Sequence, residues 1–145
     1  MITDQKKLDS LRWILRLTYG VIPIVAGLDK FFNVLTNWEQ YLNPTVARFL
    51  PFSATAFMQI AGIIEIAAGI IVLSRFTMLG AYVVSAWLTL IAITLISSGH
   101  YLDVAVRDIV MAVGAYSLGI LSEVLADSRS RAPCYEPALA RPANT

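Results

Sequence analysis

Five ionisable residues lie within or beside apolar stretches of this chain, where a charge is costly: Asp29, Lys30, Glu65, Arg107 and Asp108. On insertion scales, a charged residue at the centre of a membrane helix costs about 2.5–3.5 kcal/mol. Acidic and basic side chains in such places pair with one another, carry protons or bind the polar part of a ligand. The chemistry of the chain is therefore expected to centre on these residues.

The composition indicates an integral membrane protein. Of the 145 residues, 57% are hydrophobic and 14% are charged, whereas soluble proteins carry roughly 25% charged residues. A soluble domain of this length would expose much of its apolar surface, and a bilayer removes that problem. The net charge of +1 gives no basis for electrostatic binding of nucleic acid, which needs clustered basic residues.

Four apolar segments approach or exceed the roughly 20 residues that a spanning helix needs. They run over residues 11–35, 54–73, 76–98 and 107–125. The predicted fold is an all-α, integral membrane four-helix bundle that forms one domain over residues 1–127. Residues 128–145 are predicted to be a flexible tail. A cleaved signal peptide is disfavoured because Arg16 interrupts the first apolar run and no small-residue cleavage site follows it.

The segment between the first two spans, residues 37–53, is rich in aromatic residues and holds two prolines. Aromatic rings favour the membrane interface because one end of the ring can stay wet. An interfacial segment is predicted here, with a short helix after Pro44.

Basic residues are distributed unequally between the two ends of the four predicted spans. Lys30, Arg48 and Arg107 lie at one end, and the other eight of the 11 lysines and arginines lie at the end that carries both termini. The positive-inside rule then predicts a multi-pass protein with both termini in the cytoplasm. In a bacterium, this is the inner membrane, and the loop with His100 faces outward.

Helical phase groups the charged residues with small ones. Arg16, Gly20, Gly27 and Lys30 share one stripe of the first span, and Glu65 lies between Gly62 and Gly69 on the second. Small residues let membrane helices approach closely. Glu65 is therefore expected to meet Lys30 or an arginine, while Asp29 points about 100° away from Lys30 and needs its own partner.

These positions predict a polar intramembrane centre in the bundle. Its candidate members are Arg16, Asp29, Lys30, Glu65, Arg107 and Asp108. Such a centre can be functional, or it can consist only of buried ion pairs that fix the register between helices.

Three further side chains are candidates for ligand contact: His100, Tyr101 and Trp87. One histidine cannot supply both ligands of a bis-histidine haem, and one cysteine, Cys134, forms neither a CxxC motif nor a thiolate metal site. No dinucleotide, P-loop, serine-elbow or HExxH motif occurs. The sequence therefore predicts no catalytic residue, no metal site and no built-in cofactor; a diffusible quinone is the ligand considered.

Three stretches give the chain a resemblance to the DoxX family of small four-helix membrane proteins. They are LRWILRLTYGVIPIVAGLDKFF, QIAGIIEIAAGIIVL and LDVAVRDIVMAVGAYSLGIL, and the residues that match the family signature are Gly27, Asp29, Lys30, Glu65, Arg107 and Asp108. The resemblance implies a four-helix fold and, as in some members, partnership with oxidoreductase systems. One branch couples thiosulfate oxidation to membrane quinone, and others are linked to thiol and oxidative-stress systems.

Three functions follow as hypotheses. The first is an accessory rather than stand-alone catalytic subunit of an oxidoreductase or quinone-linked assembly, whose partners are membrane lipid and other membrane or redox proteins. The second is a structural or assembly protein without chemistry of its own. The third is a small proton-coupled transporter that uses Glu65 and Asp29.

Overall fold

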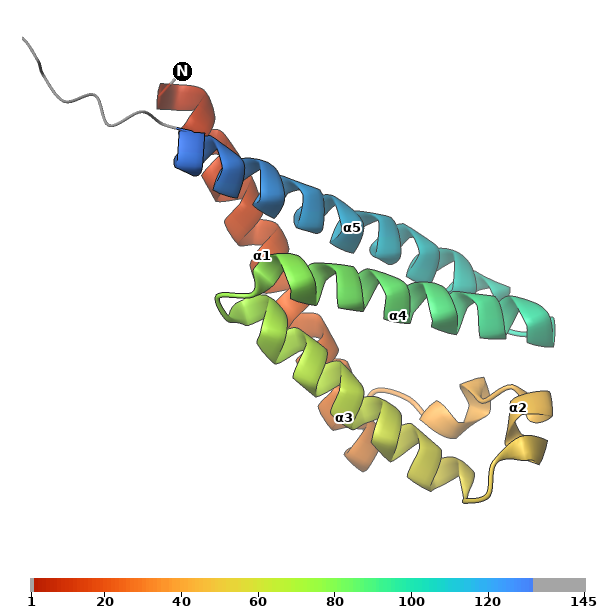
Figure 1. The fold of residues 1–145 in the computed structure, drawn as a ribbon. Helices are drawn as coiled ribbons and strands as arrows, with labels where there is room; N and C mark the ends of the chain where they lie inside the picture. The colour runs from red at the N-terminus through yellow and green to blue at the C-terminus, as the bar shows by residue number, and fades with distance from the viewer. Residues whose placement is uncertain (1, 132–145) are drawn as a thin grey trace, which may run out of the picture.

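The computed structural model describes residues 2–131, and every regular element in that range is helical (Figure 1). The elements are α1 (Ile2–Phe32), the 3-10 helix η1 (Trp38–Tyr41), α2 (Pro44–Phe49), α3 (Ala54–Leu73), α4 (Thr77–Ser98) and α5 (Leu102–Arg131). The four long helices are long and apolar enough to cross a membrane. The predicted all-α fold with four membrane-spanning helices is confirmed.

The helix bounds extend the predicted spans at the end that carries both termini. Helix α1 already begins at Ile2, and α5 continues to Arg131. Neither extension contains a proline or glycine that would stop a helix. Residues 128–131, assigned to the tail from sequence, therefore continue α5, and the rest of the predicted tail, with Cys134, lies outside the described residues.

The distribution of large and small apolar side chains is as expected for a protein embedded in a lipid bilayer. Ile63, Val110 and Val113 are each more than half exposed on the outer faces of their helices. The most buried positions include small residues such as Ala81 and Ala115, which are fully buried. Because lipid tails are themselves apolar, large apolar residues can face outward while small residues let the helices pack closely.

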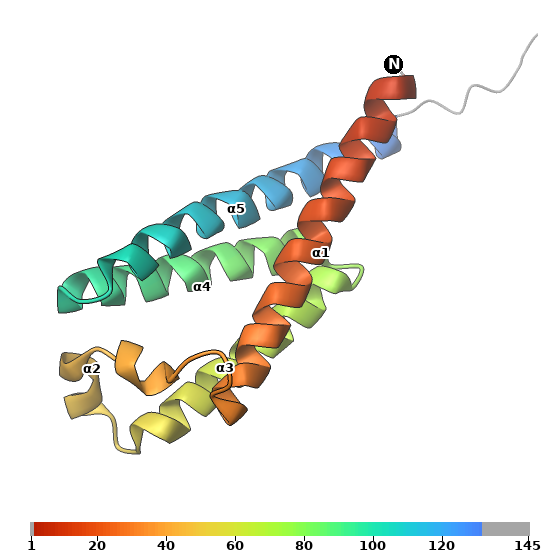
Figure 2. The ribbon, with the colours of Figure 1, turned by 180° about the vertical axis from the view of Figure 1, so that it is seen from behind.

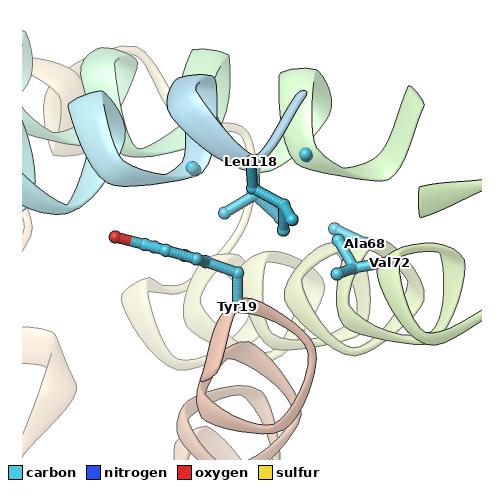
Figure 3. Packing of buried hydrophobic residues seen from close by; sticks show 7 residues of the cluster. Tyr19, Ala68, Val72 and Leu118 are labelled. Atoms are coloured by element: carbon cyan, nitrogen blue, oxygen red, sulfur yellow. The ribbon is translucent and has the colours of Figure 1, made fainter. Parts of the chain in front are cut away.

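All four long helices meet near one end of the molecule. Tyr19 from α1, Ala68 and Val72 from α3 and Leu118 from α5 converge there (Figure 3), together with two buried residues of α4. Gly80 near the start of α4 brings the backbones of α3 and α4 together, because a Cβ on this residue would lie 2.6 Å from the amide nitrogen of Val72. This end of the bundle is closely packed.

Toward the other end, the four helices separate into two pairs. Helix α1 packs along α3, and α4 packs along α5. The two pairs are joined by the short turn at 74–76 and diverge from it, with η1 and α2 lying at the wide end (Figures 1 and 2). The bundle is therefore a wedge.

The α1–α3 pair is held together by glycines that face one another. A Cβ on Gly27 would lie 2.5 Å from the carbonyl oxygen of Gly62, and one on Gly69 would lie 2.5 Å from that of Gly20. The glycines are seven residues, or about two turns, apart in both helices. The stripes of small residues predicted from helical phase form this contact, called the glycine seam below.

Candidate functional site

A cavity of about 570 Å³ lies between the two helix pairs, on the wide side of the closely packed end. Residues of all four long helices line it, together with the η1–α2 segment. Its walls are largely apolar, as at Leu95 and Met111, and the polar groups include Lys30, Glu65 and Asp108. Its volume lies within the range of about 300–1,000 Å³ that is usual for small-molecule sites.

Lys30 and Glu65 form a buried ion pair at the α1–α3 wall of the cavity. Lys30 Nζ lies 2.6 Å from Glu65 Oε2, and both side chains are about nine-tenths or more buried. In each helix the side chain leans toward its own N-terminus, so in this antiparallel pair the two side chains lean toward each other. The glycine seam at Gly27 and Gly62 brings the backbones close enough for the pair to form.

Glu65 also accepts a hydrogen bond from helix α4. Trp87 Nε1 donates to Glu65 Oε1 at 3.3 Å, so both carboxylate oxygens of Glu65 have partners. Trp87 lines the cavity. Of the three residues predicted to contact a ligand, it alone lies at this polar wall.

The Asp29 carboxylate forms its hydrogen bonds with the turn that follows α1 and not with groups at the cavity. Its carboxylate accepts hydrogen bonds from the backbone amides of Val34 and Leu35, at 2.9 and 3.0 Å from Oδ1, and from Trp38 Nε1 at 2.7 Å. These bonds stabilise a turn in which Asn33 has a φ of 51°. Asp29 is buried beside Lys30 but has its own partners, as helical phase predicts, and it does not line the cavity.

Trp38 covers the Lys30–Glu65 pair from the wide end of the wedge. Lys30 Nζ lies 3.7 Å from the centroid of the Trp38 ring, a cation–π distance. The same indole donates its N–H to Asp29. From its sequence, Trp38 belongs only to the aromatic-rich segment 37–53 that is predicted to lie at the membrane interface, because a loop residue has no helical phase that would reveal this contact.

The η1–α2 segment is anchored to the surrounding helices. Asn43 Nδ2 donates to Thr94 O and Ser97 Oγ of α4, both at 3.1 Å. The rings of Tyr41 and Tyr101 pack edge to face, with centroids 4.7 Å apart. Asn43 is not among the predicted site residues, because the sequence indicates at this point only a short helix after Pro44. The segment closes the wide end of the wedge.

Asp108 forms part of the opposite wall, on α5. It is 6% exposed, and its carboxylate lies 3.5 Å from Nε of Arg107, whose own side chain is 62% exposed. Lys30 and Glu65 line the same cavity as Asp108. The structure thus brings together Lys30, Glu65, Arg107 and Asp108 around one cavity.

Arg16 does not belong to this group, which corrects its predicted place in the polar centre. Its guanidinium donates to the carbonyl oxygens of Val72 and Ser74, at 3.2 and 2.7 Å, and to that of Leu73 between them. These carbonyls belong to the last two residues of α3 and to its C-cap, Ser74, where the helix supplies no amide donors and a cation is favoured. Arg16 shares a face with Lys30, but about four helical turns separate the two residues along α1.

His100 and Tyr101 are also separate from the cavity. They line a smaller hollow of about 230 Å³ with residues of the η1–α2 segment, including Tyr41 and Pro44. Both residues follow Gly99, whose φ of 69° ends α4. The three residues predicted to contact one ligand are therefore divided between two places.

Within residues 2–131, four helices are long and apolar enough to cross a membrane, so the fold is that of a multi-pass membrane protein. Comparison with protein-family models, with curated proteins and with solved structures finds no match for the chain.

Proposed function

We propose that this protein is a quinone-binding accessory subunit of a membrane oxidoreductase assembly and that the wedge cavity binds the quinone. The observation that carries the proposal is a cavity of about 570 Å³ with mainly apolar walls and a few polar side chains. A quinone combines a polar ring with an apolar tail. Such a ligand places its ring beside polar side chains while its tail stays in apolar surroundings.

The donors and acceptors at the cavity suit a small polar ring. Lys30 has three N–H donors, and Glu65 takes one of them at 2.6 Å. Trp38 adds aromatic surface beside Lys30, and Trp87 adds aromatic surface beside Glu65. No redox cofactor is required within the chain, because a partner subunit in this proposal supplies the electrons.

The resemblance to the DoxX family also supports a quinone-binding accessory subunit, since some members of that family work with oxidoreductases and membrane quinone. Four of the six signature residues lie at the cavity, namely Lys30, Glu65, Arg107 and Asp108.

We include in the proposal a bacterial inner membrane location with both termini cytoplasmic, which rests on the distribution of basic residues.

A binding experiment with the full chain in lipid nanodiscs tests the proposal. Decylubiquinone is titrated and binding is measured by calorimetry, with correction for partitioning into protein-free nanodiscs. Ala61→Phe places a ring in the cavity, which Ala61 lines, and should weaken binding by about tenfold or more, equivalent to about 1.4 kcal/mol. Ala67→Phe on the exposed face of the same helix is the matched control and should bind like the parent.

The partner is tested separately by gentle extraction at native abundance followed by mass spectrometry. A redox-active membrane or peripheral subunit should co-purify with the chain. Recovery of the chain alone, together with no quinone binding in nanodiscs, would rule out the proposed function.

A purely structural role is the competing function, and one observation favours it. Within the described residues, every side-chain nitrogen and oxygen that is completely shielded from solvent has a hydrogen-bond partner, as a structural ion pair requires. Under this alternative, Glu65→Gln lowers the stability of the bundle but leaves quinone binding unchanged. Under our proposal, the folded Glu65→Gln protein binds quinone more weakly, whereas Glu123→Gln, at an exposed position of α5, does not.

Proton-coupled transport fits the geometry less well. That hypothesis uses Glu65 and Asp29 together, whereas the Asp29 carboxylate is engaged by three donors and lies outside the cavity lining. Proton flux into proteoliposomes that disappears in Glu65→Gln would nevertheless support transport over our proposal.

A further inference from the structure

The two carboxylates at the cavity differ in how completely they are hydrogen-bonded. Glu65 accepts from Lys30 at 2.6 Å and from Trp87 at 3.3 Å, one donor to each oxygen. The contact that Asp108 makes within residues 2–131 is with Nε of the adjacent Arg107 at 3.5 Å. That separation is beyond the usual range of an N–H···O hydrogen bond. Asp108 thus retains most of its capacity to accept hydrogen bonds.

Asp108 is nevertheless removed from bulk water. It is 6% exposed and lines the wedge cavity on the α5 side. A buried carboxylate without strong donors is unfavourable, because it has lost hydrogen bonds to water without replacing them. A ligand with a hydrogen-bond donor at this wall would replace the hydrogen bonds that the Asp108 carboxylate has lost. The polar head group of a bound ligand is therefore expected to place a donor beside Asp108.

The chemistry of a carboxyl group selects the kind of head group. An ionised carboxylate only accepts hydrogen bonds, whereas a protonated one donates one and still accepts. A hydroxyl group is complementary to both forms, since it donates and accepts. A carbonyl oxygen only accepts and would face the lone pairs of an ionised Asp108. A hydroxyl group therefore suits Asp108 in either protonation state, whereas a carbonyl oxygen suits only the protonated one.

We infer that the cavity binds the hydroxylated, reduced form of its ligand, a quinol, in preference to the quinone, with Asp108 accepting a hydrogen bond from a ring hydroxyl. The inference rests on the proposed function and specifies which redox form the site holds. Lys30 and Glu65 form the opposite polar wall, where their mutual ion pair leaves Lys30 with donors for the second ring oxygen. The ligand tail then lies among the apolar residues.

The test compares decylubiquinol with decylubiquinone, without oxygen, on the full chain in nanodiscs. The parent protein should bind the quinol about tenfold more tightly than the quinone. Asp108→Asn should bring the ratio to within about twofold, because an amide donates to a carbonyl as readily as it accepts from a hydroxyl. Asp103→Asn, at an exposed position of the same helix that does not line the cavity, should keep the parent ratio.

The outcomes separate this inference from the proposed function. Equal binding of both forms by the parent, or an unchanged preference in Asp108→Asn, would overturn the inference and leave quinone binding intact. Absence of binding of either form would overturn both. If Asp108→Asn does not fold, Asp108→Ser provides the same test, since serine also donates and accepts and is tolerated between membrane helices. Its ratio should likewise fall close to one.

Discussion

The two faces of helix α3 illustrate two ways of using the space between membrane helices. On one face, Gly62 and Gly69 lie against glycines of α1, and the backbones are so close that no Cβ fits. On the other, α3 diverges from α4 beyond the 74–76 turn, and a cavity of about 570 Å³ opens beside Ala61. The first face fixes the position of α3, and the second leaves room for a ligand. The Lys30–Glu65 pair connects them, because the glycine seam forms it and the cavity exposes it to a ligand.

The largest effect should come from breaking the ion pair that connects the two faces. Lys30→Met leaves Glu65 buried without its cation, and removal of one partner of a buried pair costs about 3–5 kcal/mol. The free energy of unfolding in detergent micelles measures the loss. Lys30→Met combined with Glu65→Leu should recover most of it; a double variant as unstable as Lys30→Met would contradict this explanation.

The next largest effect should come from adding volume to the glycine seam. Gly69→Val places a side chain against the Gly20 carbonyl and Ile24, and such overpacking typically costs about 1–3 kcal/mol. Ala67→Val, on the exposed face of the same helix, is the control and should change stability little. Equal stability of the two variants would show that the seam is not closely packed in the membrane.

A smaller effect is expected at the narrow end of the wedge, where Arg16 binds the last carbonyls of α3. Arg16→Gln removes the charge and most of three hydrogen bonds, and the unfolding free energy should fall by about 1–2 kcal/mol. Arg75→Gln in the adjacent turn, where the guanidinium lies 4.8 Å from the centroid of the Phe76 ring, serves as the comparison. A larger loss from Arg75→Gln would argue against the capping role of Arg16.

The smallest change in stability should come from adding volume to the cavity. Ala61→Phe should alter the unfolding free energy by no more than about 0.5 kcal/mol, because the added ring enters open space. Its effect on quinone binding should be much larger than its effect on stability. A loss of stability comparable to that of Gly69→Val would mean that the wedge is closed in the bilayer, and the contrast between the two faces would fail.

Much of the fold could be predicted from the sequence because membrane helices are defined by length and composition. The four helices, the short turn after Leu73 and the helix that starts at Pro44 all follow from such local signals. Helical phase also placed Glu65 and Lys30 on the faces of α3 and α1 that meet in the structure. These features depend on residues close together in the chain.

The features that could not be predicted depend on the distance between neighbouring helices, which changes along the length of the bundle. Helical phase gives Arg16 and Lys30 the same face, but it does not say that one lies at the end of α3 and the other beside Glu65. The divergence of α3 from α4 has no local signal, so the cavity was not foreseen. The roles of Trp38 and Asn43 depend on the path of a loop, which composition alone does not determine.

The most direct test of the central claim, that the wedge is a ligand site, is a density map of the full chain extracted with its native lipid. If the wedge is a ligand site, density for a ring is expected between the Lys30–Glu65 pair and Asp108, continued by an apolar tail among the helices. A wedge filled by protein side chains, or by lipid acyl chains with no head group beside Lys30, would contradict it.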